Sequence, residues 1–287
     1  MARLPKAPDL KPLYDVGQRL PISFEVFPPK TEDKRAELRT TVSKLADADP
    51  HFISVTSSPD GRSWPRSVTV ARDLQACTEV PTAMHLTASG HTREGIASAA
   101  DELWAAGIQH ILALRGDRPA DADARGLPQA YPHAGELVAA LTERHPFGIS
   151  VAAYPEKHPE APSLDEDIVH LREKLDAGAD RALCQFVFDA AIYARFRERA
   201  ERHGVTKPLV PGVIVPTAWH RVRRFAVSAG ASVPAWLDEI FDGVPDEPEV
   251  AHLTAMAVVQ EQVRRLAAYG APAIHIYTLN TWRIPLA

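Results

Sequence analysis

The chain has 287 residues, with 32 Lys and Arg against 37 Asp and Glu, so its formal net charge is −5. This mild acidity argues against binding to nucleic acid, which requires a clustered basic face. Hydrophobic residues make up 45% of the chain and charged residues 24%, proportions that favour a globular protein over a disordered one. With only two cysteines, we expect neither a disulfide framework nor a multi-cysteine metal site.

The first twenty residues form a Pro-rich segment that carries charges throughout. Because this segment has no apolar core, it does not resemble a signal peptide, and no run elsewhere is apolar enough to span a bilayer. We therefore expect a cytoplasmic protein without membrane attachment, in which residues 1–20 are an N-terminal arm and residues 21–287 form one folded domain.

Short apolar runs that are rich in β-branched residues recur along the chain and predict eight strands. They lie at residues 22–27, 52–56, 82–87, 110–117, 149–154, 181–188, 209–215 and 273–279. Amphipathic stretches between them predict helices, at residues 31–46, 93–106, 164–177 and 190–203. Alternating strands and helices are typical of a parallel sheet, and eight units favour an α/β fold of the (β/α)8 TIM-barrel type. An open doubly wound sheet is the alternative, although no glycine-rich phosphate loop follows any strand.

The alternation of strands and helices becomes irregular after the seventh predicted strand. The seventh connection runs from residue 217 to residue 271, which is long enough to hold extra helices around residues 236–243. Only eight residues follow the last predicted strand, so the C-terminal closing helix of the barrel is predicted to be truncated. A barrel wall without that cover favours a homo-oligomer, or cover of the wall by the N-terminal arm.

Three polar residues interrupt the predicted strands near the ends at which barrel enzymes carry their active sites. Glu25 lies inside the apolar run at residues 22–27, and burial there predicts a raised pKa that suits general-acid catalysis. The alternative for Glu25 is a salt bridge across the barrel. Asp117 either faces a ligand or caps the next helix. Gln185 offers an amide suited to a heterocycle, or makes a hydrogen bond inside the barrel.

The histidines do not support a metal site. The chain has 12 of them, but neither H-x-H nor H-E-x-x-H occurs. A serine nucleophile is also unsupported, because the chain contains no G-x-S-x-G elbow. We therefore expect an enzyme without a metal ion, whose chemistry depends on the polar residues at the strand ends.

Several segments together resemble one family, the flavin-dependent methylenetetrahydrofolate reductases. SFEVFPPKT, at residues 23–31, resembles the first-strand motif of that family. The segments GIQHILALRGD, ISVAAYPEKHPEA, KLDAGADRALCQFVFD, VPGVIVP, PAWLDEIFDG and HIYTLN follow in the family's order. The resemblance implies a TIM barrel that binds FAD and reduces 5,10-methylenetetrahydrofolate to 5-methyltetrahydrofolate. It further implies a ping-pong reaction through flavin N5, with NADH or NADPH as the electron donor.

The resemblance also implies roles for individual residues. Glu25 resembles the general acid that protonates the leaving nitrogen, and Asp117 resembles a residue near both the pterin and the flavin. Gln185, Trp219 and Thr281 fall where the family binds its substrates. The positions that correspond to FAD contacts are Thr56, His85, Arg115, Gly116, Asp117, His133, Ala134, Tyr154, His158, Ala161, Asp167, His170 and Lys174.

Because no glycine-rich loop is present, Lys174 and Arg172 are the candidates to bind the FAD pyrophosphate. Both lie on the helix predicted at residues 164–177. The absence of a Rossmann fingerprint also leaves the choice between NADH and NADPH open.

Some positions depart from the pattern of the family. Residues 57–67 replace a glycine-rich turn, Trp219 stands where Phe is common, His133 where Tyr is common, and Thr281 where Arg is frequent. These departures keep two alternatives open. One is an enzyme of the same fold that works mainly as a 5-methyltetrahydrofolate oxidase or dehydrogenase, and the other is a catalytically silent partner subunit.

Overall fold

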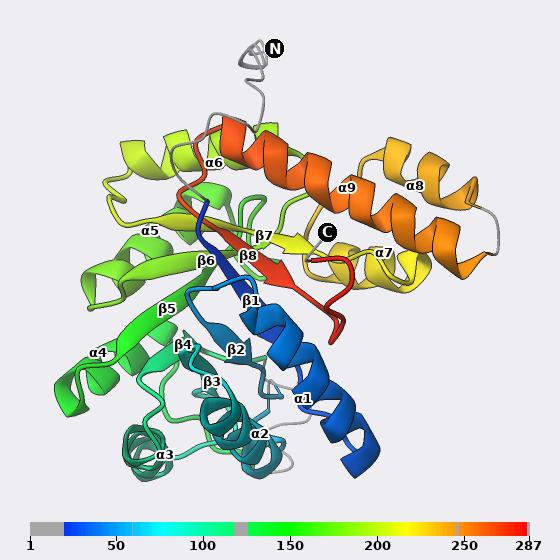
Figure 1. Cartoon of the computed structure of the whole chain (residues 1–287). Coiled ribbons are helices and arrows are strands. Elements are labelled where there is room, and N and C mark those ends of the chain that lie inside the picture. The colour runs from blue at the N-terminus through cyan, green and yellow to red at the C-terminus, as the bar shows by residue number, and fades with distance from the viewer. Residues whose placement is uncertain (1–19, 59, 118–125, 245–246, 286–287) are drawn as a thin grey trace.

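The computed structural model describes residues 20–58, 60–117, 126–244 and 247–285. The N-terminal arm expected at residues 1–20 lies almost wholly outside the described residues. Figure 1 shows the eight strands at the centre of the molecule, with the helices around them.

All eight predicted strands are present, and each pairs in parallel with its neighbours. Strands β1 to β8 span Ile22–Val26, Ile53–Val55, Thr82–Thr87, His110–Leu114, Gly148–Ala153, Arg181–Phe186, Leu209–Ile214 and Ile274–Tyr277. β8 pairs with β1, with Ser23 opposite His275, so the sheet closes into a barrel in the order of the sequence. The predicted (β/α)8 barrel is confirmed.

Helices α1 to α6 follow the first six strands, at Glu32–Ala46, Trp64–Cys77, Arg93–Ala105, Ala134–Arg144, Leu164–Asp176 and Ala190–Arg202. The four helices predicted from the sequence correspond to α1, α3, α5 and α6. Side-chain caps help to fix where these helices begin. Thr92 Oγ1 accepts a hydrogen bond from the Gly95 N–H (3.0 Å), and Ser163 Oγ accepts one from the Glu166 N–H (3.2 Å). Apolar residues of the helices pack on the strands in one large core.

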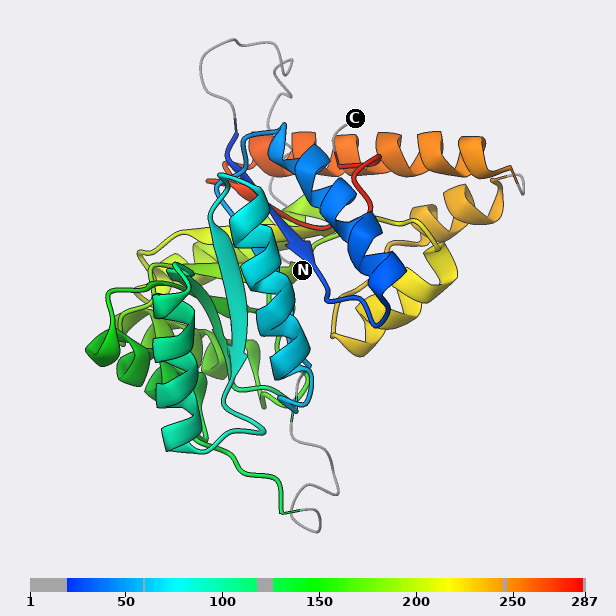
Figure 2. The same cartoon turned by 60° about the horizontal axis from the view of Figure 1, so that its bottom comes forward.

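The seventh connection contains three helices, as predicted: α7 (Trp219–Ser228), α8 (Ala235–Asp242) and α9 (Pro248–Ala268). They lie together on one side of the barrel in Figures 1 and 2, in yellow and orange. A second core cluster, which includes Phe186, Ile214 and Leu237, packs these helices against β6 and β7.

After β8 the described chain, which continues to residue 285, forms turns rather than a helix, in agreement with the truncated closing helix. Leu279 and Asn280 adopt positive φ angles of 51° and 60°. The Asn280 side chain accepts a hydrogen bond from the Phe27 N–H and donates one to the Phe27 carbonyl, both at 2.9 Å. The turn after β8 is therefore fastened to the loop after β1, at the C-terminal end of the barrel.

The N-terminal end of the barrel is closed by Phe52, which precedes β2 and is 4% exposed. Its ring stacks on that of His110 with the centroids 6.3 Å apart, and the Arg181 guanidinium lies 5.7 Å from its centroid. These side chains come from β2, β4 and β6, in the alternate-strand layering that is typical of barrel interiors. Ligands therefore reach the barrel from its other end.

We predict that Phe52→Ala lowers the free energy of unfolding by about 3 to 5 kcal/mol, because it leaves a cavity in this layer. Urea denaturation measures the change. The matched control is Phe225→Ala, whose ring is 54% exposed on α7 and whose loss is expected to cost less than about 1 kcal/mol. Equal losses in the two variants would contradict the role of Phe52 in closing the barrel.

Candidate active site

A cavity of about 750 Å³ opens beside the C-terminal ends of β4 and β5 and extends between α4 and α5. Its volume is typical of sites for small molecules and cofactors. Eleven of the thirteen positions expected to contact FAD line it: Arg115, Gly116, Asp117, His133, Ala134, Tyr154, His158, Ala161, Asp167, His170 and Lys174. Thr56 and His85, the other two, lie outside its lining.

The loop after β5 forms one wall of this cavity and is held in shape by Lys157. This residue has a positive φ of 98°, and its Nζ donates hydrogen bonds to the carbonyls of Ala161 (2.6 Å) and His158 (3.2 Å). The His158 N–H donates to Asp167 Oδ2 (2.8 Å), which ties the loop to α5. His158 and Ala161 are therefore fixed in the wall by contacts within the motif AYPEKHPEA.

Tyr154 and Arg115 line the inner part of the same cavity. The Tyr154 ring contacts the His158 ring edge-on, with the centroids 4.6 Å apart. Burial raises the pKa of Tyr154 to about 12, and the charge of Asp117 adds to the effect. The hydroxyl therefore stays protonated and is able to donate a hydrogen bond to a ligand. Arg115 pairs with Glu160 at 2.6 Å.

Lys174 brings a buried amine to the cavity from α5. Its Nζ donates a hydrogen bond to the Ala152 carbonyl (2.7 Å). Burial lowers the pKa of Lys174 to about 8, and the neighbouring charge of Asp167 only partly offsets this effect. A bound anion would supply the counter-charge that burial of the ammonium requires. Lys174 therefore suits an anionic ligand.

Glu25 lies in the barrel interior, outside the lining of the cavity. Its Oε2 is 3.1 Å from His85 Nε2 on β3 and 3.5 Å from His275 Nε2 on β8. Both contacts lie within ion-pair distance, but neither Nε2 makes a hydrogen bond of normal geometry among the described residues. On its other side, His275 Nδ1 lies 2.8 Å from Ser23 Oγ.

The pKa that the sequence predicts for Glu25 is wrong for this structure. Burial alone would raise the pKa, as expected, but the charge of His85 and the close contact with His275 outweigh burial and lower the pKa to about 2. The structure places Glu25 within ion-pair distance of imidazoles on β3 and β8, which is the contact across the barrel that the alternative interpretation predicts. Glu25 is therefore ionised at neutral pH.

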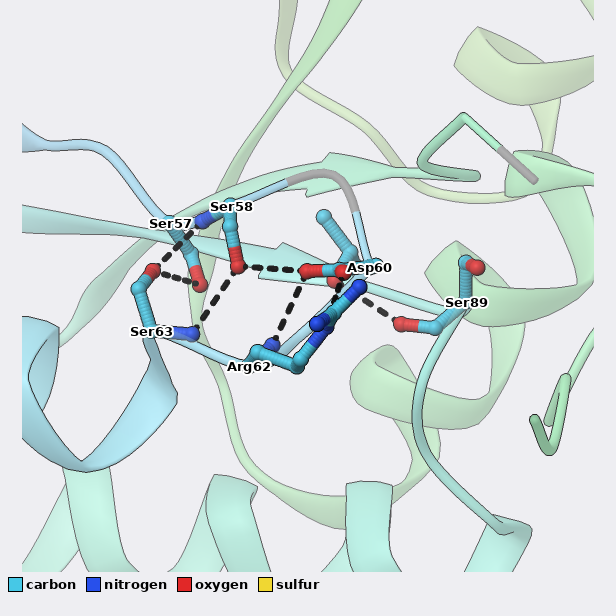
Figure 3. Close-up of polar contacts among 7 residues, drawn as sticks. Ser57, Ser58, Asp60, Arg62, Ser63 and Ser89 are labelled. Carbon is cyan, nitrogen blue, oxygen red and sulfur yellow. Dashed lines mark hydrogen bonds and ion pairs between the residues drawn. The ribbon is translucent and has the colours of Figure 1, made fainter. Parts of the chain in front are cut away.

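The loop after β2, where the sequence departs from the family pattern, is a compact turn closed by its own side chains (Figure 3). Asp60 Oδ1 accepts hydrogen bonds from Ser58 Oγ (2.9 Å) and from the Arg62 N–H (3.2 Å), and the Arg62 guanidinium pairs with the same carboxylate. The Ser58 N–H donates to Ser63 Oγ (2.6 Å), while the Ser63 N–H donates to Ser58 Oγ (2.9 Å). The turn also contains Gly61, which has a positive φ of 73° and whose N–H donates a hydrogen bond to the Ser58 carbonyl (2.9 Å).

In the described parts of the chain, no group of His, Cys, Asp or Glu is arranged to hold a metal ion. No helix among the same residues is long and apolar enough to cross a membrane.

Residues 13–286 match the protein-family model described as Methylenetetrahydrofolate reductase. The chain belongs to the methylenetetrahydrofolate reductase family. It is 37% identical to the 5,10-methylenetetrahydrofolate reductase of Pectobacterium carotovorum subsp. carotovorum over 93% of this chain and 88% of that protein. The corresponding protein of Escherichia coli (strain K12) is 36% identical over 93% of this chain and 89% of its own length.

One solved structure shares the fold of this methylenetetrahydrofolate reductase family member at low sequence identity. It is described as "Uncharacterized protein from Clostridium thermocellum binds two copies of 5-methyl-5,6,7,8-tetrahydrofolic acid". The TM-score is 0.59 at 12% identity, over 90% of this chain and 88% of that chain.

The resemblance implies that Trp219 contacts a substrate, but the structure packs its side chain into the second core cluster. The side chain is 6% exposed, its Nε1 donates a hydrogen bond to Asp238 (2.8 Å), and its ring stacks on Phe241 with the centroids 4.9 Å apart. The exposed ring on α7 is that of Phe225, 5.3 Å from the ring of Phe186.

The other expected substrate positions also lie outside the lining of the large cavity. Gln185 is half-buried on β6, and its Oε1 accepts a hydrogen bond from the Phe186 N–H (3.1 Å). Thr281 lies in the turn after β8, where its N–H donates to the Thr278 carbonyl (3.0 Å).

Arg172 does not join Lys174 in the cavity. Its Nη1 donates a hydrogen bond to the His203 carbonyl at the end of α6 (3.1 Å), because residues two apart on a helix face different directions. Sequence reasoning missed Ser23 and His275 as neighbours of Glu25. The sequence signal that could have identified them is that each is a polar residue within an apolar strand segment, at residues 22–27 and 273–279.

We predict that Lys174→Met raises the stability of the protein when no anion is bound in the cavity. Below pH 8 the buried ammonium destabilises the native state by roughly 3 kcal/mol, because its pKa is about 8 rather than 10.5. The melting temperature should rise by a few degrees at pH 7. This gain should shrink as the pH rises from 8 to 10.5, since Lys174 then loses its proton in the native state. A lower melting temperature at pH 7 would contradict the prediction.

Proposed function

We propose that this protein reduces 5,10-methylenetetrahydrofolate to 5-methyltetrahydrofolate, using FAD and an electron donor that is either NADH or NADPH. The donor and the folate would react in turn at one face, in a ping-pong sequence. Membership of the family supports the folate reaction. The observation that supports the proposed proton transfer is the cluster of Glu25, His85 and His275, whose side chains can hold and move a proton.

The volume of the large cavity, about 750 Å³, and the polar groups in its lining support FAD as its ligand. In this proposal the loops after β4 and β5 hold the cofactor through Arg115, Gly116, Asp117, Tyr154, His158 and Ala161, and the helices hold it through His133, Ala134, Asp167, His170 and Lys174. Thr56 and His85 complete the set from β2 and β3. When bound, FAD supplies the hydride chemistry, while the protein supplies orientation, charge and a proton.

The proton for the leaving nitrogen of the folate comes from Glu25 in this proposal. Since the Glu25 carboxyl is ionised in the free protein, it must first acquire a proton, and the imidazoles of His85 and His275 are the nearest groups able to provide one. Ser23, bonded to His275 Nδ1, orients that ring. Asp117 and Gln185 would bind the pterin, and Thr281 would border the substrate. The enzyme would work in the cytoplasm as a homo-oligomer.

Glu25→Gln tests the assigned proton transfer. Folate reduction should fall by at least about 100-fold, because the amide cannot donate the required proton efficiently. Transfer from NAD(P)H to menadione through the flavin should stay within about twofold of wild type, since that half-reaction needs no protonated leaving group. Stopped-flow spectroscopy of the two half-reactions measures both rates.

Two results would contradict the proposal. Equal losses in both half-reactions would remove Glu25 from its role as the acid. A purified protein that shows no flavin absorbance after incubation with FAD would reject the flavin-dependent function as a whole.

A further inference from the structure

The strand pairing between β1 and β8 ends at Glu25, which stands opposite Tyr277. One more backbone hydrogen bond follows, from the Thr278 N–H to the Glu25 carbonyl (3.2 Å). The chain then turns, because Leu279 and Asn280 have positive φ angles of 51° and 60°. Further contacts from this segment to the end of β1 therefore come from side chains.

Two side chains take over the pairing at this point. Thr278 Oγ1 donates a second hydrogen bond to the Glu25 carbonyl (2.7 Å), whose oxygen has two lone pairs to accept them. The Asn280 amide accepts a hydrogen bond from the Phe27 N–H and donates one to the Phe27 carbonyl, both at 2.9 Å. A strand residue would offer the same acceptor and donor through its backbone. The Asn280 side chain therefore replaces a strand residue beside Phe27.

The turn that carries these side chains is held in one shape by its surroundings. Asparagine tolerates a left-handed backbone, but for leucine the same conformation is strained and persists only where other contacts hold it. Leu279 packs against the second core cluster, and Thr278 is fully buried. Thr41 Oγ1 on α1 also donates a hydrogen bond to the Asn280 carbonyl (3.4 Å).

All these bonds fall on the backbone on which the Glu25 side chain is mounted. The Glu25 carboxylate lies 3.1 Å from His85 Nε2 and 3.5 Å from His275 Nε2. A shift of the β1 backbone would change both distances, and it would also move the carboxyl relative to a bound substrate. Proton transfer depends steeply on such distances.

We propose that Thr278 and Asn280 are positioning residues for Glu25, whose hydrogen bonds to the end of β1 set the geometry of proton transfer to the folate. This inference rests on the proposed function, in which the proton passes from the Glu25 carboxyl to the leaving nitrogen and leaves a carboxylate. Both residues act through Glu25. The reduction of the flavin by NAD(P)H, which needs no protonated leaving group, therefore does not depend on them.

Thr278→Val tests the hydroxyl, because valine keeps the shape of the side chain and lacks the donor. The rate at which the reduced enzyme converts 5,10-methylenetetrahydrofolate in a single turnover should fall about tenfold. Flavin reduction by NADH should stay within about twofold of wild type. Thr278→Ser, which restores the donor, should recover most of the lost rate. Stopped-flow spectroscopy measures both half-reactions.

Asn280→Asp is an independent variant for the amide. Aspartate tolerates the left-handed backbone and still accepts from the Phe27 N–H, but when ionised it cannot donate to the Phe27 carbonyl. It should slow the folate half-reaction selectively, as Thr278→Val does. The matched control is Thr254→Val on α9, which removes a half-buried hydroxyl that donates to the Val250 carbonyl (2.9 Å). This control should leave both half-reactions unchanged.

A double variant shows whether the hydroxyl acts through Glu25. Glu25→Gln/Thr278→Val should convert the folate at the same rate as Glu25→Gln alone, to within about twofold, because no acid remains to be positioned. Infrared difference spectra against Glu25→Gln give a readout that does not depend on activity. The carboxylate bands of Glu25 should shift in Thr278→Val and return to their wild-type positions in Thr278→Ser.

Thermal melts check that each variant is folded. The inference is overturned if both Thr278→Val and Asn280→Asp keep the wild-type rate of folate reduction, or if they slow the two half-reactions equally. It is also overturned if Thr278→Val lowers the rate about tenfold in the Glu25→Gln background. Absence of flavin binding or of folate reduction in the wild type would instead reject the proposed function, and this inference with it.

Discussion

A carboxylate inside a closed β-barrel must be compensated by opposite charge, because transfer of an unpaired charge from water into the interior is costly. Glu25 meets this constraint with imidazoles from β3 and β8. Closure of the barrel is what makes the contact possible. Ser23 and His275, 252 residues apart in the chain, become neighbours only when β8 pairs with β1.

The end of the chain reinforces the same junction. Thr278 Oγ1 donates a hydrogen bond to the Glu25 carbonyl (2.7 Å), and Asn280 holds both backbone groups of Phe27. The short segment after β8 therefore positions the first-strand motif, although it forms no closing helix in its described part. The Phe52 ring, packed against His110 and Arg181, fills the opposite end of the barrel and also contacts the His275 ring, with the centroids 5.9 Å apart.

The site contains two environments that differ in how a buried charge is compensated. Inside the barrel, a carboxylate is held ionised by two imidazoles. In the cavity outside it, an amine on α5 is buried without enough counter-charge and its pKa falls to about 8. The first environment suits the movement of a proton, and the second suits the binding of an anion. The proposed flavin-dependent reduction of a folate requires both.

The fold could be predicted from sequence because each strand segment is apolar and because four of the connections show clear helical periodicity. The positions that line the cavity could also be predicted, since LRGD and AYPEKHPEA are local motifs. The pKa of Glu25 could not be predicted from sequence, because its partners His85 and His275 come from strands far away in the sequence. The predicted orientations of Arg172 and Trp219 were wrong for a similar reason, because the packing of the helices decides which way each side chain points.

The central claim is that Glu25 rests as a carboxylate between two imidazoles and takes up a proton only when it acts. Infrared difference spectroscopy of wild type against Glu25→Gln at pH 7 measures this directly. The account predicts carboxylate bands assignable to Glu25 in the free protein and no carbonyl band of a protonated acid. A protonated-acid band that disappears in Glu25→Gln would contradict it.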